Sequence, residues 1–193
     1  TVAYIVDRFK QAGLQPGNPD GKGGASWFQD VPMVEITAGN VQPLTFTGGK
    51  TPVSLAYRND MVAGTYRVVP SIELKDSPVV FVGYGINAPE KGWNDYAGVD
   101  VKGKTVVILV NDPDWQTMTR DGPFEGRAMT YYGRWTYKFE EAARQGAAAA
   151  IIVHQTEPAA YPWAVVQSSW TGPQLELDEK GDHQDQSRMI GWI

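Results

Sequence analysis

The sequence contains few of the side chains that bind transition metals. It has no cysteine and only two histidines, His154 and His183. A zinc centre needs several imidazole, thiolate or carboxylate ligands close together. His154 ends an apolar run and His183 stands beside Asp182 and Asp185, and neither has the surroundings of a zinc-binding His-x-Asp pair. We therefore expect no metal site or other cofactor in this chain, and interpret His154 as a strand-end histidine with a hydrogen-bond partner.

Oxygen-bearing side chains crowd the polar stretch 111–127, where Asn111, Asp112, Asp114 and Asp121 occur. Calcium prefers such ligands, but their spacing does not fit the EF-hand loop. Asp and Asn are also frequent turn formers because their side chains bond to nearby backbone groups. We interpret the stretch as a turn-rich loop, with a calcium site as the alternative.

A glycine-containing motif follows an apolar run at residues 83–88, which read Gly-Tyr-Gly-Ile-Asn-Ala. The pattern G-x-G-x-x-A can mark a dinucleotide phosphate loop when a helix begins directly after it. Pro89 and Gly92 make that helix improbable. The motif therefore predicts the end of a strand and a tight turn.

The sequence shows no nucleophile for hydrolysis. The Gly-x-Ser-x-Gly elbow does not occur, and Ser168 and Ser169 have no evident His and Asp partners. With neither a nucleophile nor a metal-ligand set, the chain does not read as a complete small hydrolase.

Aromatic residues and prolines gather in residues 155–174, which we expect to form a loop segment. They include Tyr161, Trp163 and Trp170, in a chain with seven tryptophans. Exposed aromatic side chains on loops are typical of recognition surfaces. The alternative, to which we give equal weight, is that these rings fill the space beneath a long loop.

The elements that would position these residues centre on one helix followed by one buried strand. Trp135, Phe139, Ala142 and Ala143 recur at helical spacing. Gly146 stands where a helix end favours the left-handed conformation. The continuous apolar run 147–153 is typical of a strand covered on both faces.

Further elements are predicted around this unit. An amphipathic helix is expected from Val2 to Phe9 and a strand from Trp27 to Ile36. Apolar strands are expected at 77–82 and 105–110, and a closing strand at 189–193, with Gly181 at a hairpin tip before it. Strands broken by glycine turns, with few helices, indicate a β-rich α+β domain.

Composition narrows the class of protein further. The chain has 193 residues, 42% hydrophobic and 20% charged, with a net charge of −5. No basic stripe or long apolar run is present, so nucleic-acid and membrane partners are not expected. Its first residues lie inside an amphipathic pattern and its last inside an apolar run, so we expect a segment of a longer protein, with any export signal upstream.

Two long stretches of the sequence resemble a known family. The stretches "VVFVGYGINAPEKGWNDYAGVDVKGKTVVILVNDP" and "GRWTYKFEEAARQGAAAAIIVH" are similar to protease-associated (PA) domains, in particular to the PA insert of bacterial secreted zinc aminopeptidases with a paired-metal centre. The opening "YIVDRFKQAGLQPG…SWFQDVPMVE" resembles the start of the catalytic domain of the same enzymes.

The resemblance implies a fold and a division of the chain. Residues 1–44 would be a helix and strand of the catalytic domain, and residues 45–193 a PA-type swivelling β/β/α domain, a β-rich, partly open barrel with flanking helices. The zinc ligands and the catalytic base would lie in the rest of the parent enzyme. Those enzymes carry an adjacent Glu pair at the metals, but Glu140 and Glu141 stand in the PA helix, where we expect a solvated face.

The resemblance also implies a role and a location. The segment would be a non-catalytic module of a periplasmic or secreted aminopeptidase, would contact the catalytic domain of the same chain and peptide substrates, and would cover the active site or aid substrate selection. The candidate contact residues are Arg134, Trp135, Tyr161, Trp163, Gln167 and Trp170.

A tryptophan-rich carbohydrate-binding module is the alternative from a different functional class. Acidic charge and many tryptophans suit sugar stacking. An all-β sandwich, however, would not contain the helix and strand unit that is expected at 135–153.

Overall fold

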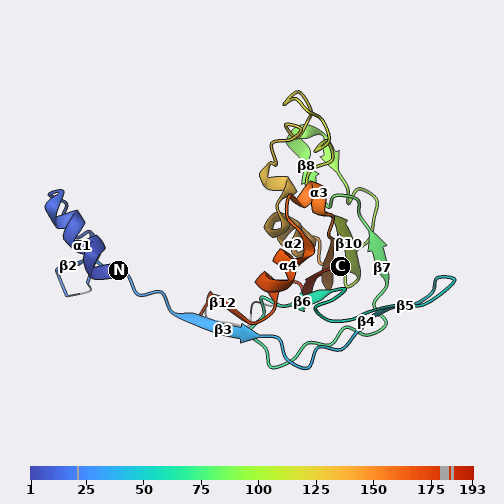
Figure 1. Cartoon of the computed structure of the whole chain (residues 1–193), viewed down its shortest axis with the longest axis horizontal. Coiled ribbons are helices and arrows are strands. Elements are labelled where there is room, and N and C mark those ends of the chain that lie inside the picture. Colours follow the sequence, from blue (N-terminus) through green and yellow to red (C-terminus); the bar gives the residue numbers. More distant parts are fainter. Residues whose placement is uncertain (21, 179–182, 184) are drawn as a thin grey trace. The chain divides into compact units, whose positions relative to one another are not determined.

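The computed structural model describes residues 1–20, 22–178, 183 and 185–193 (Figure 1). It contains two compact units, Thr1–Met33 and Val34–Ile193. The predicted division between residues 44 and 45 separates a piece of the catalytic domain from the PA domain of the parent protein, and it stays a prediction. The predicted hairpin tip at Gly181 lies outside the described residues.

The first unit is a helix with a short hairpin. Helix α1 covers Val2–Gln11, and strands β1 (Asn18–Pro19) and β2 (Ala25–Ser26) pair antiparallel. The helix is confirmed, but the strand predicted from Trp27 to Ile36 is wrong in its first half. There the carbonyl of Phe28 accepts a hydrogen bond from the Asn18 side chain at 2.7 Å instead of pairing in a sheet, and Pro32 has no N–H to offer.

A five-stranded mixed sheet is the centre of the second unit, and its strand order is β6-β13-β11-β10-β7. Four strands run parallel and edge strand β6 runs antiparallel to β13. The strands are β6 (Val62–Gly64), β7 (Val79–Phe81), β10 (Thr105–Leu109), β11 (Ala149–Val153) and β13 (Met189–Trp192). The sequence predictions for β7, β10, β11 and β13 are confirmed.

Side chains alternate between two hydrophobic layers across this sheet, as the two-residue period of a strand requires. On β11, Ala150 and Ile152 belong to the layer that includes Phe139, Val166 and Trp192. Ala149 and Ile151 belong to the opposite layer, with Met61. Both faces of β11 are therefore covered, which explains its continuous apolar sequence.

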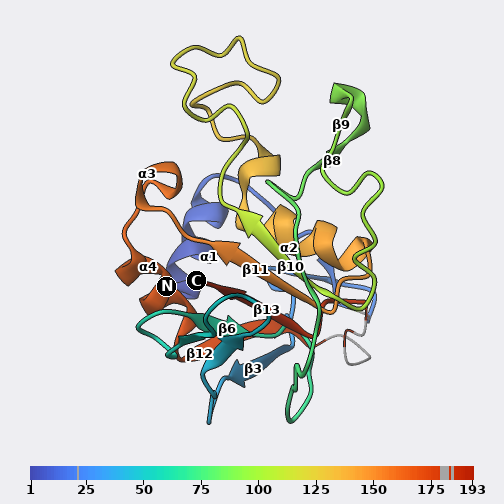
Figure 2. The ribbon, with the colours of Figure 1, turned by 90° about the vertical axis from the view of Figure 1, so that its right-hand side faces the viewer.

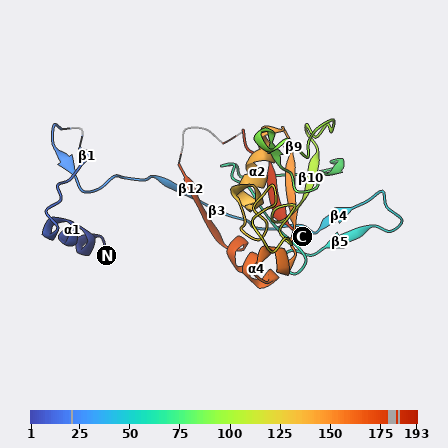
Figure 3. The same cartoon turned by 90° about the horizontal axis from the view of Figure 1, so that it is seen from above.

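Helices cover the first face and a β-ribbon covers the second. Helix α2 (Trp135–Arg144) and helix α4 (Trp163–Trp170) lie on the same side of the sheet (Figure 1). On the other face, residues of strands β4 (Leu44–Phe46) and β5 (Val53–Leu55) pack onto the sheet, and Figure 3 shows their hairpin projecting beyond it. The layers are thus ribbon, sheet and helices.

Short elements complete the second unit. Strand β3 (Met33–Thr37) pairs with β12 (Pro173–Leu177) apart from the main sheet. The hairpin β8–β9 and the chain between β10 and α2 extend beyond one end of the sheet (Figure 2). The remaining elements are β8 (Asn87–Ala88), η1 (Pro89–Lys91), β9 (Trp93–Asn94), η2 (Tyr131–Gly133) and α3 (Thr156–Ala159).

The two glycines after β7 form the tight turn that the sequence predicts. Gly83 and Gly85 have φ values of +56° and +61°. A Cβ on Gly85 would lie 2.9 Å from the Cγ2 of Ile108, so both the backbone conformation and the available space require glycine. No α-helix follows the turn, because only a short hairpin and the 3-10 helix η1 come next. The motif is therefore not a dinucleotide loop.

The predicted α+β class, with few helices flanking a β-rich centre, is confirmed. Within the described residues, no helix is long and apolar enough to cross a membrane.

Candidate functional site

The aromatic segment is more ordered than the sequence predicts. Residues 155–174 are not one loop, because they contain α3, α4 and the start of β12. Helix α4 begins directly after Pro162, a residue that favours the extended conformation before a helix. Its apolar periodicity is weak: four of its eight residues are exposed and Val166 is the buried one. The prediction of a loop was therefore wrong.

Four aromatic rings from three elements form a cluster beneath α4. Trp170 lies at the end of α4, and its ring centroid is 5.6 Å from that of Trp135 and 5.7 Å from that of Phe139. Trp192 of β13 lies 6.4 Å from Trp170. Trp135, Trp163 and Trp170 are half-buried and pack on the core. Each of these three tryptophans thus has one part exposed to solvent and another part packed on the core.

Two side chains of α4 fix the helix to a distant loop. The indole Nε1 of Trp163 and the amide Nε2 of Gln167 donate to the same carbonyl oxygen, that of Arg58, at 3.0 and 3.1 Å. Arg58 has a φ of +74°, a conformation that is uncommon for a residue with a Cβ. The sequence indicated neither this loop nor the bonds that it makes.

His154 stacks against the same segment. Its ring lies 5.5 Å from that of Tyr161 and 5.8 Å from that of Trp163. Both ring nitrogens are buried, and neither makes a hydrogen bond of good geometry with a described residue, although the nearby Tyr161 backbone favours the protonated form and so acts to raise the pKa. Burial lowers the pKa of His154. The structure thus shows ring stacking for His154, and its predicted hydrogen-bond partner stays a prediction.

Arg134 stands at the start of α2 and is exposed. Burial raises the pKa of Tyr161, and the positive charge of Arg134 partly opposes this shift. Arg134 thus acts electrostatically on a residue of the aromatic segment, and its role as a contact residue stays a prediction. All six candidate contact residues belong to the second unit, at the beginning of α2 and along residues 161–170.

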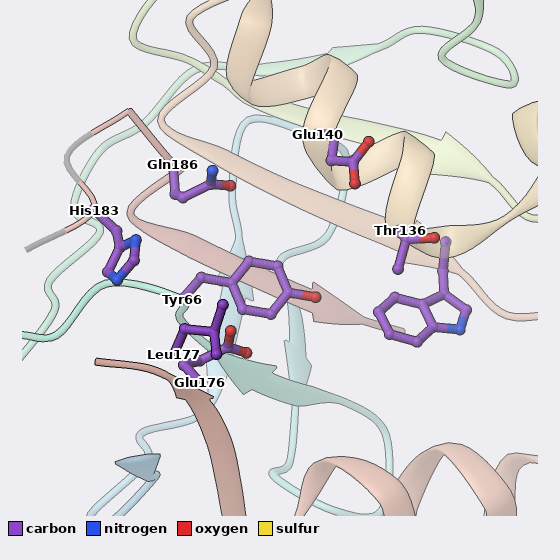
Figure 4. Close-up of a pocket in the computed structure, with 8 residues that line it drawn as sticks. Tyr66, Thr136, Glu140, Glu176, Leu177, His183 and Gln186 are labelled. Atoms are coloured by element: carbon purple, nitrogen blue, oxygen red, sulfur yellow. The ribbon is translucent and has the colours of Figure 1, made fainter. Parts of the chain in front are cut away.

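A pocket of about 470 Å³ opens beside this cluster and shares Trp135 with it. Its lining comes from β12, α2 and two loops. Figure 4 shows the Tyr66 side chain extending between Glu140 and Glu176. The lining residues are Tyr66, Trp135, Thr136, Glu140, Glu176, Leu177, His183 and Gln186.

The pocket combines aromatic walls with two carboxylates. Burial raises the pKa of Tyr66, and the negative charges of Glu176 and Glu140 raise it further. Burial also raises the pKa of Glu176, while the nearby His183 opposes that shift. These effects show that both carboxylates act on the same phenol in a partly desolvated site.

Only one member of the Glu pair lies on a solvated helix face. Glu140 is partly exposed and accepts hydrogen bonds from the hydroxyl of Tyr131 at 3.0 and 2.9 Å. Glu141 is 4% exposed. Its carboxylate accepts from Arg144 at 2.7 Å, Gln145 at 2.7 Å and Asn87 at 3.3 Å. The prediction of a solvated face is thus wrong for Glu141, because α2 packs against β8 on that side.

A buried lysine on α2 holds the neighbouring turns together. The Nζ of Lys138 donates to the carbonyl oxygens of Tyr84 at 2.6 Å and Tyr132 at 3.1 Å. Burial lowers the pKa of Lys138 to about 7, with Asp112 and Asp95 opposing the shift. Sequence reasoning missed this residue, because its helical position alone does not distinguish it from a solvated lysine.

The acidic loop after β10 serves as a turn. Asp112 is buried and accepts hydrogen bonds from the backbone N–H and the hydroxyl of Thr130 at 2.7 and 3.0 Å. One oxygen of Asp114 accepts from the N–H of Phe124 at 2.9 Å. In the part of the chain that the structure describes, no three potential metal ligands among His, Cys, Asp and Glu come together. The turn interpretation is therefore favoured over the calcium site.

No family profile matches the chain, and no curated protein matches it. A solved structure, the aminopeptidase from Aneurinibacillus sp. strain AM-1, is similar over 100% of this chain and 31% of that chain, with 20% sequence identity and a TM-score of 0.34. The chain thus spans about a third of that protein. Similarity this low does not decide fold or function.

Proposed function

We propose that this chain is the PA-type, non-catalytic segment of a longer zinc aminopeptidase that is periplasmic or secreted. Support comes from the phrases that resemble PA domains. The second phrase folds as the helix and buried strand that the resemblance implies, α2 and β11, joined by Gly146 at φ +79°. The first phrase supplies β7, β8, β9 and β10.

The observation that carries the proposed role is the fixed position of α4. The side chains of Trp163 and Gln167 both donate to the carbonyl of Arg58. The ring of Trp170 contacts the rings of Trp135 and Phe139 edge to face. A surface held by such contacts loses little conformational entropy when a partner binds it. We infer that this surface faces the catalytic domain of the same chain, narrows the entrance to its active site and favours some peptide substrates over others.

Zinc chemistry in this proposal belongs to the longer protein. The described residues gather no set of side chains that fits a zinc centre, so no catalytic step is assigned to residues of this chain. The segment contributes by its shape and by its contacts.

No observation favours the carbohydrate-binding alternative. Sugar binding would need tryptophan faces open to solvent, whereas Trp135, Trp163 and Trp170 pack on the core. The central sheet is mostly parallel and covered by helices, unlike an all-β sandwich.

Replacing Trp163 with alanine in the full-length enzyme is expected to change substrate selection. The variant loses an aromatic face and one of the two bonds to Arg58, so the entrance becomes wider and less rigid. We expect kcat/KM for long peptides to change by about 3- to 10-fold relative to dipeptides, which corresponds to roughly 1 kcal/mol of differential binding.

Ser169→Ala is the matched control on the same helix, because Ser169 is exposed and only its backbone carbonyl accepts a hydrogen bond, from Gln174. It should leave the ratio between long and short peptides unchanged. A uniform fall of kcat/KM for all peptides in Trp163→Ala, together with a lower Tm, would show that the residue is merely part of the core.

A further inference from the structure

Lys138 is a titratable side chain in the interior of the second unit. It lies on helix α2 and is 0% exposed. Burial disfavours the charged ammonium form, because the protein interior solvates charge less well than water does. Such a lysine either keeps its charge with the help of partners or gives up its proton. The groups around Lys138 therefore decide which form the fold prefers.

The hydrogen bonds of Lys138 match a neutral amine. Its Nζ donates to the carbonyl oxygens of Tyr84 at 2.6 Å and Tyr132 at 3.1 Å, and the described residues offer it no third acceptor. An ammonium group has three N–H donors, whereas a neutral amine has two. Two donors thus meet two acceptors in the neutral form, and protonation would leave one buried N–H without a partner.

The carboxylates that face Lys138 are engaged with other groups. Asp112 and Asp95 both favour the charged form of the lysine, but within the described residues neither forms an ion pair with it. Asp112 accepts hydrogen bonds from the backbone N–H and the hydroxyl of Thr130. Asp95 accepts from the indole N–H of Trp93 at 3.0 Å. The buried ammonium form would therefore lack a direct counter-charge.

Two tyrosines complete the surroundings of Nζ. The ring of Tyr84 lies 5.8 Å away and attracts a cation weakly. The bond from Tyr132 to Glu90 raises the pKa of that phenol to about 12, so Tyr132 stays neutral. Burial outweighs the attraction of the carboxylates and lowers the pKa of Lys138 to about 7. The charge of Lys138 thus changes near neutral pH.

Lys138 joins α2 to two segments that extend beyond one end of the sheet (Figure 2). We call them the distal lobe: residues 84–95, which contain hairpin β8–β9, and residues 111–133, which end in η2. Both segments contribute to a small hydrophobic cluster around Ile86 and Phe124. A change in the charge of the lysine therefore acts on the packing of this lobe against α2.

We propose that Lys138 is a proton-sensitive latch, which holds the distal lobe against α2 while its amine is neutral and loosens that contact when the amine takes up a proton. The protonated form places a charge and an unpaired N–H in the interior, and opening of the lobe hydrates both. Because η2 directly precedes Arg134 and Trp135, the loosening extends to the start of α2. This role rests on the buried lysine alone and does not depend on the proposed peptidase role.

The direction of the pH effect follows from proton binding. In the open lobe Lys138 has the ordinary lysine pKa of 10.5, whereas in the closed lobe its pKa is about 7. Between these values the open form binds more protons, so a rise in pH favours closure, by up to about tenfold per pH unit. Below the lower value both forms carry the proton, and the contribution of Lys138 to the pH dependence ends.

The first measurement is an NMR titration of the lysine Cε shifts in the wild-type chain. We expect one lysine to titrate with a midpoint near pH 7, while the others titrate near pH ~10. The shifted signal should be missing in Lys138→Met, a variant that keeps an apolar side chain of similar length without the amine. Because the wild-type chain supplies the midpoint, the measurement decides the charge state even if the variant does not fold.

The second measurement is amide hydrogen exchange at pH 6 and pH 8, corrected for the intrinsic exchange rate. The N–H of Asn87 reports opening of the lobe, because it donates to the hydroxyl of Tyr137 on α2 at 3.1 Å. Its opening constant should fall about tenfold between the two pH values in the wild type, and should stay constant in Lys138→Met.

Lys75→Met is the matched control, because Lys75 is exposed and its side chain makes no hydrogen bond or ion pair with a described residue. It should respond to pH as the wild type does. Three results would overturn the inference. These are a midpoint near pH ~10 for every lysine, an equal response of Asn87 in the wild type and Lys138→Met, and an equal response at Ile151 in the central strand β11, which would place the effect in the whole domain. None of these results bears on the peptidase role, which is tested in the longer protein.

Discussion

Replacing Phe139 with alanine is expected to lower the free energy of unfolding by about 3–5 kcal/mol. The side chain is 1% exposed and belongs to the helix-side layer of the core. Its ring lies 5.7 Å from that of Trp170 and 6.2 Å from that of Trp135. The truncation removes buried surface and leaves a cavity that these large rings cannot fill by small movements.

Phe81→Ala is the matched control for this prediction. Phe81 is the same residue type on edge strand β7, but it is 62% exposed. Its loss should cost less than about 1 kcal/mol, as is usual for exposed positions. Both values come from urea unfolding with a common slope. Equal losses in the two variants would show that Phe139 does not carry the packing of α2 on the sheet.

Glu141→Ala is expected to cost about 2–3 kcal/mol, while Glu140→Ala should cost less than about 1 kcal/mol. Glu141 is buried, and its carboxylate binds Arg144, Gln145 and Asn87. The alanine variant leaves the half-buried amide of Asn87 with one acceptor fewer. Glu140 contacts Tyr131 and Arg144 at the surface, where water replaces these bonds at little cost.

The variant Glu141→Gln separates charge from hydrogen bonding. It keeps one acceptor oxygen and should lose less stability than Glu141→Ala. The measurement is again urea unfolding, with Glu140→Ala beside it. A larger loss for Glu140→Ala than for Glu141→Ala would contradict the orientation of α2 that the structure shows.

The central helix and strand could be predicted because their signals are local. Phe139 and Ala142 mark one helix face, Gly146 marks the helix end, and the run to Val153 marks a strand covered on both sides. All of these features hold in the structure. The turn at Gly83 and Gly85 was predictable for the same reason, since the backbone conformation depends on the glycines themselves.

The candidate site was only partly predictable because it depends on contacts between distant residues. The bonds from Trp163 and Gln167 to Arg58 join positions more than 100 residues apart. The burial of Glu141 depends on Asn87, 54 residues earlier. The pocket unites Tyr66, Trp135 and Glu176, and no periodicity in the sequence relates these three. Such features follow from the packing of elements.

The most direct test of the central claim compares the 193-residue chain with the longer protein that we propose contains it. Both are assayed for hydrolysis of an aminoacyl-p-nitroanilide before and after removal of metal with a chelator. The proposal predicts that the longer protein hydrolyses the substrate, loses activity on chelation and regains it with added zinc, while the 193-residue chain shows no activity and holds no stoichiometric zinc. Hydrolysis by the 193-residue chain alone, one or two zinc ions bound to it, or a longer protein without aminopeptidase activity would contradict the account.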